Sequence, residues 1–424
     1  MPDGTATAHT YRPKLVTVLS DGYGFGCFRK DMLAALTVAI VALPLSMAIA
    51  VASGVSPERG LYAAVIGGFL VSALGGSRYQ IGGPAGAFIV LVAATVTRFG
   101  LEGLLLTVFI SGFMLMVIGL LRLGALIRYI PHAVTVGFTA GIAVTIFASQ
   151  LRILGGLTLP VAEPGPLLPK LAMLAQALPT FTPAAFAIGV GSAAFIFLLR
   201  RRAPNWPGML IAVALATVAA WLFHLPVETI GSRFGQLPDG LPGPRLPAIS
   251  YRTVLEVLPA ALSFTLLGAV ESLLSAKVAD GMTGRKHRYN MEVVAQGIAN
   301  IASALFGGIS VTGTIARTAT NIRAGACSPV SGMAHALFVL LFMIVAAPLA
   351  SYVPLSALAG VLVVVCWNMA EKDEFLHLLH KWRSAAVLIA TFGLTVIEDL
   401  TVGIIAGCAL AAVFAIYDRA RGSA

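Results

Sequence analysis

The chain has 424 residues, of which 58% are hydrophobic and 11% are charged, and its formal net charge is +10. Soluble proteins carry roughly 25% charged residues, so this chain has too few to cover a water-facing surface, and a soluble protein is excluded. The basic residues fall between apolar runs instead of gathering on one polar face, which argues against a nucleic-acid partner.

Fourteen apolar segments follow one another from Asp31 onward, and we interpret each as a span of an all-α polytopic membrane protein. Their expected ranges are 31–51, 60–75, 84–97, 103–121, 131–150, 182–199, 207–223, 257–279, 292–306, 313–324, 329–349, 354–369, 384–397 and 400–417. The third and tenth segments are short, and each follows a glycine-rich stretch. The longest links, 152–181 and 224–256, are rich in Pro and Gly and are expected to be loops.

The distribution of Lys and Arg predicts the topology. With the N-terminus in the cytoplasm, 20 of the 28 Lys and Arg residues fall on the inner side and 7 on the outer side, with Arg317 counted apart. The positive-inside rule therefore predicts 14 spans across the cell (plasma) membrane, with both termini cytoplasmic. The polar segment 1–30 contains no apolar core of a cleavable signal peptide.

A weak internal duplication divides the 14 spans into two halves. The sequence "YIP" at 129–131 precedes the fifth span, and "YVP" at 352–354 precedes the twelfth. The glycine breaks at 83–84 and 312–313 are separated by nearly the same interval as these two motifs. Because seven spans per half is an odd number, the second copy would enter the membrane from the opposite side. This pattern predicts an inverted repeat, a common architecture of secondary transporters.

Two glycine-rich stretches predict helices that begin inside the membrane. The first is "SRYQIGGPAGAF" at 77–88, where Pro84 suits the first turn of a helix. The second is "SVTGTIAR" at 310–317, where a second half-helix would begin near Gly313. Irregular backbone at membrane depth is tolerated only where protein or a water-filled cavity surrounds it. Two half-helices that begin there would direct their unpaired N–H groups and positive dipole ends inward.

Arg317 adds a full positive charge about one turn into the second half-helix. Two helix N-termini and a guanidinium together favour an anion-binding site. The alternative is that Gly and Thr only permit close helix packing, with Arg317 reaching to an interface. An unpaired Arg at mid-span is costly, which favours the functional interpretation.

Glu271, in "LLGAVESLLSAKVAD" at 266–280, is the one acidic residue that the sequence places deep in a span. Ser275 lies four residues later, on the same helix face. A carboxylate beside a hydroxyl could accept a proton or bind Na⁺, and so couple anion movement to an ion gradient. A structural ion pair between Glu271 and Arg317 is the alternative. Pro44 is expected to kink the first span, so that Leu45, Ser46 and Ile49 line the same cavity.

Other polar residues in or near the spans receive structural interpretations. His335 is expected to be a packed neutral imidazole rather than a proton relay, and His132 to lie at an interface. The segment "EKDEFLHLLHKWR" at 371–383 predicts an amphipathic inner-surface helix instead of a metal site. The four cysteines (Cys27, Cys327, Cys366 and Cys408) have no metal-like spacing.

From about Asp31 to Asp418, the chain resembles the sulfate permease (SulP) family of anion transporters, which includes animal sulfate, bicarbonate and chloride exchangers. Four motifs carry the resemblance: "VALPLSMAIAVASGVSPERGLYAAVIGG", "SRYQIGGPAGAF", "ESLLSAKVADGMTGRKHRYNMEVVAQGIAN" and "FGGISVTGTIARTATN". The resemblance implies two inverted seven-span repeats, with half-helices in spans 3 and 10, divided into core and gate domains. The implied parts are a cytoplasmic N-terminal segment (1–30), core spans 1–4 (31–128), gate spans 5–7 (129–224), an extracellular-side loop (225–256), core spans 8–11 (257–350), gate spans 12–14 (351–418) and a C-terminal tail (419–424).

The resemblance also implies a site between the starts of spans 3 and 10, flanked by spans 1 and 8. Glu271 and Ser275 match the family positions linked to cation coupling, and Leu45 stands where many relatives have glutamine. Relatives usually carry a cytoplasmic STAS domain after the last span, whereas this chain ends at "YDRARGSA", so we expect a membrane domain without one. The substrate contacts carried over from the family are Ala85, Gly86, Ala87, Thr314, Ile315, Ala316 and Arg317.

We therefore expect a secondary active anion transporter with elevator-like alternating access, coupled to H⁺ or Na⁺. An uncoupled exchanger or an anion channel on the same scaffold is the alternative. A nucleobase permease is less favoured, because those proteins tend to carry an acid in the tenth span. An enzyme is not expected, since no nucleophile and base constellation is present. The expected partners are a small anion and membrane lipid, and a homodimer is compatible with this interpretation. No metal or organic cofactor is expected. The identity of the anion stays open.

Overall fold

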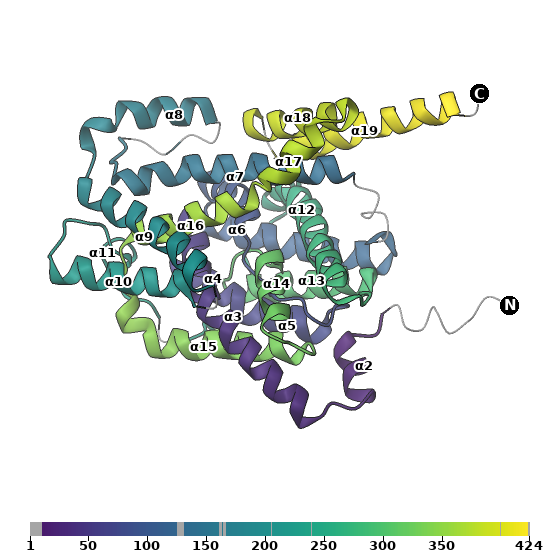
Figure 1. Ribbon diagram of the computed structural model, residues 1–424, viewed down its shortest axis with the longest axis horizontal. Helices are drawn as coiled ribbons and strands as arrows, with labels where there is room; N and C mark the ends of the chain where they lie inside the picture. The colour runs from purple at the N-terminus through teal and green to yellow at the C-terminus, as the bar shows by residue number, and fades with distance from the viewer. Residues whose placement is uncertain are drawn as a thin grey trace.

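The computed structural model describes residues 11–422 except 125–130, 161–162, 164–166, 205, 239 and 399, and these residues are mostly helical (Figure 1). The first half contains α2 (Lys14–Ser20), α3 (Phe25–Ala52), α4 (Pro57–Tyr62), the π-helical turn η1 (Ala63–Gly67), α5 (Gly68–Leu74), β1 (Gly82–Gly83), the 3-10 turn η2 (Gly86–Phe88), α6 (Ile89–Leu120), α7 (His132–Gly155), α8 (Leu167–Gln176), η4 (Leu178–Thr180), α9 (Pro183–Arg202) and α10 (Gly208–Leu222). The second half contains α11 (Ile230–Phe234), α12 (Tyr251–Thr283), α13 (Tyr289–Leu305), β2 (Thr312–Gly313), α14 (Ile315–Arg323), α15 (Val330–Ala350), α16 (Leu355–Met369), α17 (Lys372–Leu379), α18 (Trp382–Ile397) and α19 (Leu400–Gly422).

Many helices have the length and composition needed to cross a membrane. Within the described residues, seven helical segments of 18 residues or more are sufficiently apolar, and shorter apolar helices lie at 208–222, 382–397 and 402–417. Most expected spans correspond to one helix within a few residues, as α15 does for 329–349. The segment at 371–383 contains α17, and none of the residues of α17 is buried. This exposure is consistent with the predicted surface helix.

Several expected boundaries were wrong. The link at 152–181 contains α8, and the link at 224–256 contains α11 and the first residues of α12. The helix α3 begins at Phe25, inside the segment that the sequence assigned to the polar N-terminus. Pro and Gly indicated loops in the two links, but each link also contains a short helix with a buried apolar residue, Leu174 in α8 and Ile230 in α11. Tyr129 and Ile130 of the first repeat motif lie outside the described residues.

The third and fourth expected spans are two helical segments within α6, and they meet at a kink at Gly100. Gly100 has φ 68° and ψ −173°, which is not helical, so the chain changes direction there. A side chain would make this conformation costly, and glycine removes that cost. The expected boundary between the two spans, at 98–102, therefore lies at this kink, which consists of one non-helical residue and no loop.

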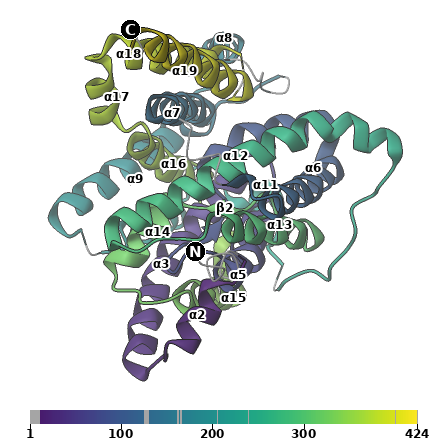
Figure 2. The ribbon, with the colours of Figure 1, turned by 90° about the vertical axis from the view of Figure 1, so that its right-hand side faces the viewer.

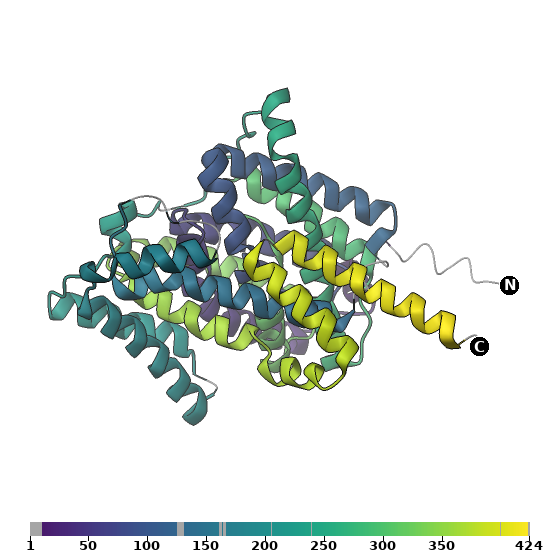
Figure 3. The same ribbon diagram turned by 90° about the horizontal axis from the view of Figure 1, so that it is seen from above.

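The helices form two groups. The first group contains α3, α5, α6 and α12–α15, which contact one another. In the second, α7 packs against α16, α18 and α19, and α9 packs against α16. In Figure 2, α7, α8 and α17–α19 lie at the top of the molecule, above the first group. Figure 3 looks down on the second group, with the yellow α18 and α19 on one side and the teal α8–α10 on the other. The α16 helix also contacts α3, so it joins the two groups.

Close contact between α6 and α13 holds the first group together. Gly112 of α6 and Gly297 of α13 face each other. A Cβ atom added to either glycine would lie only 2.6–2.7 Å from the carbonyl O of the other. Small residues let helix backbones approach this closely, which maximises packing where apolar burial from water contributes little. The two glycines therefore fix the distance between these helices.

We predict that Gly297→Ala destabilises the protein, because the added Cβ would meet backbone atoms that cannot move aside. Overpacking of this kind costs about 1–3 kcal/mol. Gly191→Ala in α9 is the matched control, since no atom lies within 4 Å of a Cβ there. Thermal unfolding in detergent should show a lower Tm for G297A and an equal or higher Tm for G191A. Equal Tm values for G297A and the wild type would contradict the packing argument.

Candidate functional site

The polypeptide crosses itself at the two glycine-rich segments that the sequence singled out. The strands β1 and β2 pair in antiparallel register, with Gly82 opposite Gly313. All four strand residues are buried. The pairing gives their backbone groups partners in a region that water does not reach, as buried backbone requires. It also brings 84–87 and 314–317, the two predicted halves of the site, to one place.

A helix begins immediately after each strand. Thr314 is the extended residue before α14, and Ala85 is the extended residue before η2, which leads into α6 at Ile89. The first of these helices thus begins with a 3-10 turn, and its α-helix starts later in the chain than Pro84, where the sequence placed it. Neither Thr314 nor Ala85 makes a side-chain cap hydrogen bond. The first N–H groups of both helical segments therefore lack the side-chain acceptor that usually caps a helix.

Arg317 is buried, with 2% of its surface exposed, and its guanidinium is directed toward the opposite strand. Its Nη2 donates to Ser46 Oγ at 3.1 Å and to the Pro84 carbonyl O at 3.3 Å. Its Nε and Nη1 have no hydrogen-bond partner among the described residues. This geometry differs from the alternative in which Arg317 reaches an interface. A guanidinium has only hydrogen-bond donors, so the two unpartnered nitrogens can bind a ligand that supplies acceptors.

Gly83 makes room for this guanidinium. A Cβ at Gly83 would overlap Arg317 Nη1, so any other residue at this position would displace the charge. The sequence interpreted the glycine as a helix break, but the structure adds a second reason for it: close approach of a side chain to the backbone.

Glu271 and Arg317 do not form an ion pair within the described residues. Glu271 is half-buried, and its Oε2 is buried without a hydrogen-bond partner. Its turn of α12 lies next to β2, since Thr312 Oγ1 donates to the Gly268 carbonyl O at 3.3 Å. Ser275 directs its hydroxyl to α14, where Ser275 Oγ donates to Thr318 Oγ1 at 3.3 Å. The two residues expected to act together thus face one region but are not bonded to each other.

The remaining predicted contacts differ in exposure. On α3, Ser46 contacts Arg317 directly, while Leu45 and Ile49 are buried with 7% and 2% of their surfaces exposed. The other members range from buried to exposed: Ala85, Ala87 and Thr314 are buried, Gly86 and Ile315 are half-buried, and Ala316 is exposed.

A set of buried polar side chains that sequence reasoning missed holds the crossing in place. Gln80 Nε2 donates to Ser272 Oγ at 2.8 Å, which ties the segment before β1 to α12. Asn300 of α13 pairs with the backbone of Val311: its Nδ2 donates to the carbonyl O at 2.8 Å, and its Oδ1 accepts from the N–H at 2.9 Å. The Ile81 N–H donates to Thr318 Oγ1 at 3.1 Å. The signal available in the sequence was a few amides inside otherwise apolar spans, which usually have a stated role.

Two other carboxylates, those of Glu292 and Asp31, are fully buried in the fold, whereas Glu271 is half-buried. Glu292 Oε2 accepts from the N–H groups of Gly76 and Ser77 at 2.8 and 2.9 Å. Asp31 accepts from the N–H groups of Cys327 and Ser328. Both carboxylates therefore accept hydrogen bonds from backbone N–H groups, and hydrogen bonds of this kind stabilise a buried negative charge. Glu271 Oε2 has no such donor, and Glu292 Oε1 likewise has no hydrogen-bond partner within the described residues.

The two histidines have different surroundings. His335 of α15 is fully buried, and neither ring nitrogen has a hydrogen-bond partner within the described residues. His132 is exposed at the start of α7, and its Nε2 lies 3.0 Å from Glu374 Oε1. His132 therefore stands at a helix end, as expected, and its place at a membrane interface stays a prediction.

A model of the sulfate permease family matches residues 28–392. The YvdB protein of Bacillus subtilis (strain 168) is 46% identical over 395 residues, which cover 93% of this chain and 74% of YvdB. The bicarbonate transporter BicA of Picosynechococcus sp. is 30% identical over 404 residues, which cover 92% of this chain and 71% of BicA.

The fold is also that of a solved transporter domain. The transmembrane domain of a cyanobacterial bicarbonate transporter, BicA, superposes with a TM-score of 0.81 at 29% identity, covering 91% of this chain and 98% of that one. The sequence motifs, the crossing of two helix starts and these matches agree with one another. The chain therefore belongs to the sulfate permease family, whose members are membrane transporters of anions and not enzymes.

Proposed function

We propose that the chain is a secondary active transporter that binds a small oxyanion, of the bicarbonate, sulfate or dicarboxylate class, where β1 and β2 cross. The observation that carries this proposal is the buried guanidinium of Arg317, which keeps two unpartnered nitrogens beside two uncapped helix starts. An anion would accept hydrogen bonds from all three groups. The relative BicA, named for bicarbonate, supports this class of substrate.

The charge of the site suits an oxyanion. Each helix start contributes roughly half a positive charge from its unpaired N–H groups. Arg317 contributes one full charge, so the protein groups of the site together carry roughly +2 in a region of low dielectric constant. A monovalent or divalent anion neutralises most of this charge. Ser46 is held by Arg317 and offers a further hydroxyl group at the same place.

The inverted repeat of seven spans per half is part of the proposal. Two structural equivalences support it. Pro131 and Pro354, in the two "Y-x-P" motifs, are both extended residues directly before a helix, α7 and α16. The strands β1 and β2 occupy matching positions after the second and ninth expected spans, and each leads into a helix. Fourteen spans with both termini cytoplasmic is the topology that we propose with it.

Alternating access would follow from the two helix groups. We assign spans 1–4 and 8–11 (31–128 and 257–350) to a core that carries the anion, and spans 5–7 and 12–14 (129–224 and 351–418) to a gate. Gly86, at the start of the third span, lies next to the gate side chains Ile146, Val365 and Met369. These contacts are apolar and involve no hydrogen bond, so the core could slide past them in an elevator-like movement.

Glu271 is the proposed coupling residue. Its Oε2 has no donor and it lies in the turn of α12 beside β2, so a proton or Na⁺ would supply the missing partner. Ser275, one turn later, places a second oxygen near the same strand. Binding of the cation beside the anion would lower the cost of carrying either charge alone through the membrane.

Replacing Arg317 should remove anion uptake. Arg317→Gln takes away the full charge, and Arg317→Lys keeps the charge but loses the planar fork. We expect at least about a tenfold loss of uptake for R317Q, the size of a lost charge-assisted hydrogen bond, and a smaller loss for R317K. Labelled bicarbonate and sulfate uptake into proteoliposomes, with folding checked by Tm, measures this. Uptake by R317Q at the wild-type rate would reject the site.

Gly83→Ala tests the same site without deleting a charge. The new Cβ would push the guanidinium away from the crossing, so we expect uptake to fall although Arg317 is unchanged. Gly281→Ala in α12 is the control, because no atom lies within 4 Å of a Cβ there. Full uptake by both variants would mean that the position of the guanidinium does not matter.

Glu271→Gln should uncouple transport. We expect gradient-driven uptake to be lost while anion exchange at equal concentrations continues, because glutamine keeps the shape but binds no cation. Glu256→Gln is the matched control: Glu256 lies in the same helix, is exposed and pairs with Arg252 at 2.9 Å. Uptake under imposed pH and sodium gradients separates H⁺ from Na⁺. Wild-type accumulation by E271Q, or rapid currents that ignore both gradients, would favour an uncoupled exchanger or a channel.

A further inference from the structure

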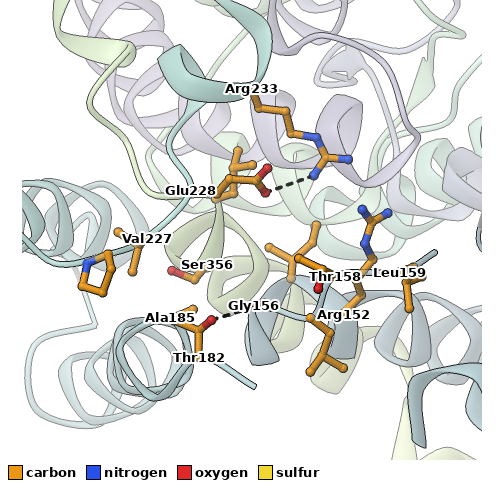
Figure 4. Close-up of a pocket in the computed structure, with 14 residues that line it drawn as sticks. Arg152, Gly156, Thr158, Leu159, Thr182, Ala185, Val227, Glu228, Arg233 and Ser356 are labelled. Carbon is orange, nitrogen blue, oxygen red and sulfur yellow. Dashed lines mark hydrogen bonds and ion pairs between the residues drawn. The ribbon is translucent and has the colours of Figure 1, made fainter. Parts of the chain in front are cut away.

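A cavity of about 350 Å³ lies away from the crossing and shares no residue with it. It is lined by the end of α7 and the chain after it, the beginning of α9, the segment before α11 and Arg233 within α11, and the first turn of α16 (Figure 4). The lining contains two arginines, one carboxylate and three hydroxyl-bearing side chains among apolar walls: Arg152, Arg233, Glu228, Thr158, Thr182 and Ser356.

The two arginines approach the cavity from opposite sides. Figure 4 shows the guanidinium groups of Arg152 and Arg233 directed toward each other. Glu228 Oε2 lies 3.6 Å from Arg233 Nη1, and the Arg152 side chain makes no hydrogen bond or ion pair with the described residues. Burial lowers the pKa of Arg233, Glu228 raises it, and Arg152 lowers it further. The cavity therefore carries one excess positive charge that no side chain neutralises.

Ser356 supplies an unpaired donor inside the cavity. It is 3% exposed, and its Oγ is buried without a hydrogen-bond partner among the described residues. It lies in the first turn of α16, where the Ala357 N–H donates to the carbonyl O of the N-cap residue Pro354 at 3.1 Å. The Leu355 N–H is already used by the Glu228 carbonyl O at 2.9 Å, which fixes the direction of this turn. Buried hydroxyl groups are almost always paired, so an unpaired one indicates a ligand or water as its partner.

We propose that this cavity is a second anion site, which binds a small oxyanion between Arg152, Arg233 and Ser356. A guanidinium presents two parallel N–H groups that match two oxygens of an oxyanion, whereas a spherical anion would use only one of them well. The hydroxyl of Ser356, in the first turn of α16, provides a donor in the wall of the cavity. The volume exceeds that of one oxyanion, so ordered water would complete the site.

Two helices connect this second site to the crossing. Arg152 and Ile146 both lie in α7, roughly 9 Å apart along the helix axis. Ser356 and Val365 both lie in α16, roughly 14 Å apart along its axis. Ile146 and Val365 are neighbours of Gly86 at the crossing. An anion in the cavity would thus hold together the ends of the two helices against which the proposed core moves, and it would change the transport rate without entering the transport path.

The test is titration of the purified full chain in lipid nanodiscs with sodium sulfate or sodium bicarbonate. Sodium gluconate keeps the ionic strength constant, and a parallel titration with gluconate alone measures its own binding. Isothermal titration of the wild type should show two sites. Arg152→Gln and Ser356→Ala should each leave one site of unchanged affinity and weaken the other about tenfold or more. Arg252→Gln, an exposed arginine paired with Glu256, is the matched control and should keep both sites.

A single site in the wild type that R317Q abolishes, or wild-type titration curves for both R152Q and S356A, would overturn the proposal. The outcome is independent of the proposed transport function. If R317Q abolishes uptake while R152Q leaves binding unchanged, only the second site is rejected. If S356A loses one site while sulfate and bicarbonate are not transported by the wild type, the second site stands and the proposed function is rejected.

Discussion

The antiparallel pairing of β1 with β2 is the constraint on which the rest of the structure depends. Two residues from each half of the chain pair their backbone N–H and C=O groups with each other. Both segments can therefore leave helical geometry while buried, without unpaired backbone groups. Each then begins a helix whose first N–H groups are uncapped. Arg317 reaches across the pairing to Pro84 and thereby joins the charge of one helix to the backbone before the other. Without the pairing, neither helix could begin where it does.

Side chains from the surrounding helices hold the crossing rigid and leave its donors free. The side-chain amide of Asn300 pairs with both backbone groups of Val311, as a neighbouring strand would. The side chain of Gln80 is held by its hydrogen bond to Ser272. These bonds use polar side chains other than Arg317, whose Nε and Nη1 keep no hydrogen-bond partner within the described residues. The donors that remain are the ones that an anion would need. A site prepared in this way costs little reorganisation when its ligand arrives.

The sequence predicted the parts of this site that depend on local composition. Glycine with proline at 83–84 and an arginine after Gly313 are unusual in apolar segments, so both halves of the site and the charge between them could be located. Partners distant in the sequence could not: the buried acids Glu292 and Asp31 bind backbone N–H groups in the opposite half of the chain. Helix α8 was missed because Pro and Gly in the link outweighed its apolar residues. The exposure of Ala316 depends on how α14 is rotated, which no local pattern reports.

The most direct test of the central claim is a structure of the protein with bound selenate, located by the anomalous scattering of selenium. The proposed site requires a selenium peak between 84–87 and 314–317, within hydrogen-bonding reach of the Arg317 guanidinium. A second peak between Arg152 and Arg233 would be compatible with this. Selenate bound in the protein only at other places, with the space beside Arg317 occupied by a side chain or lipid, would contradict the claim that two helix starts and one guanidinium form the transport site.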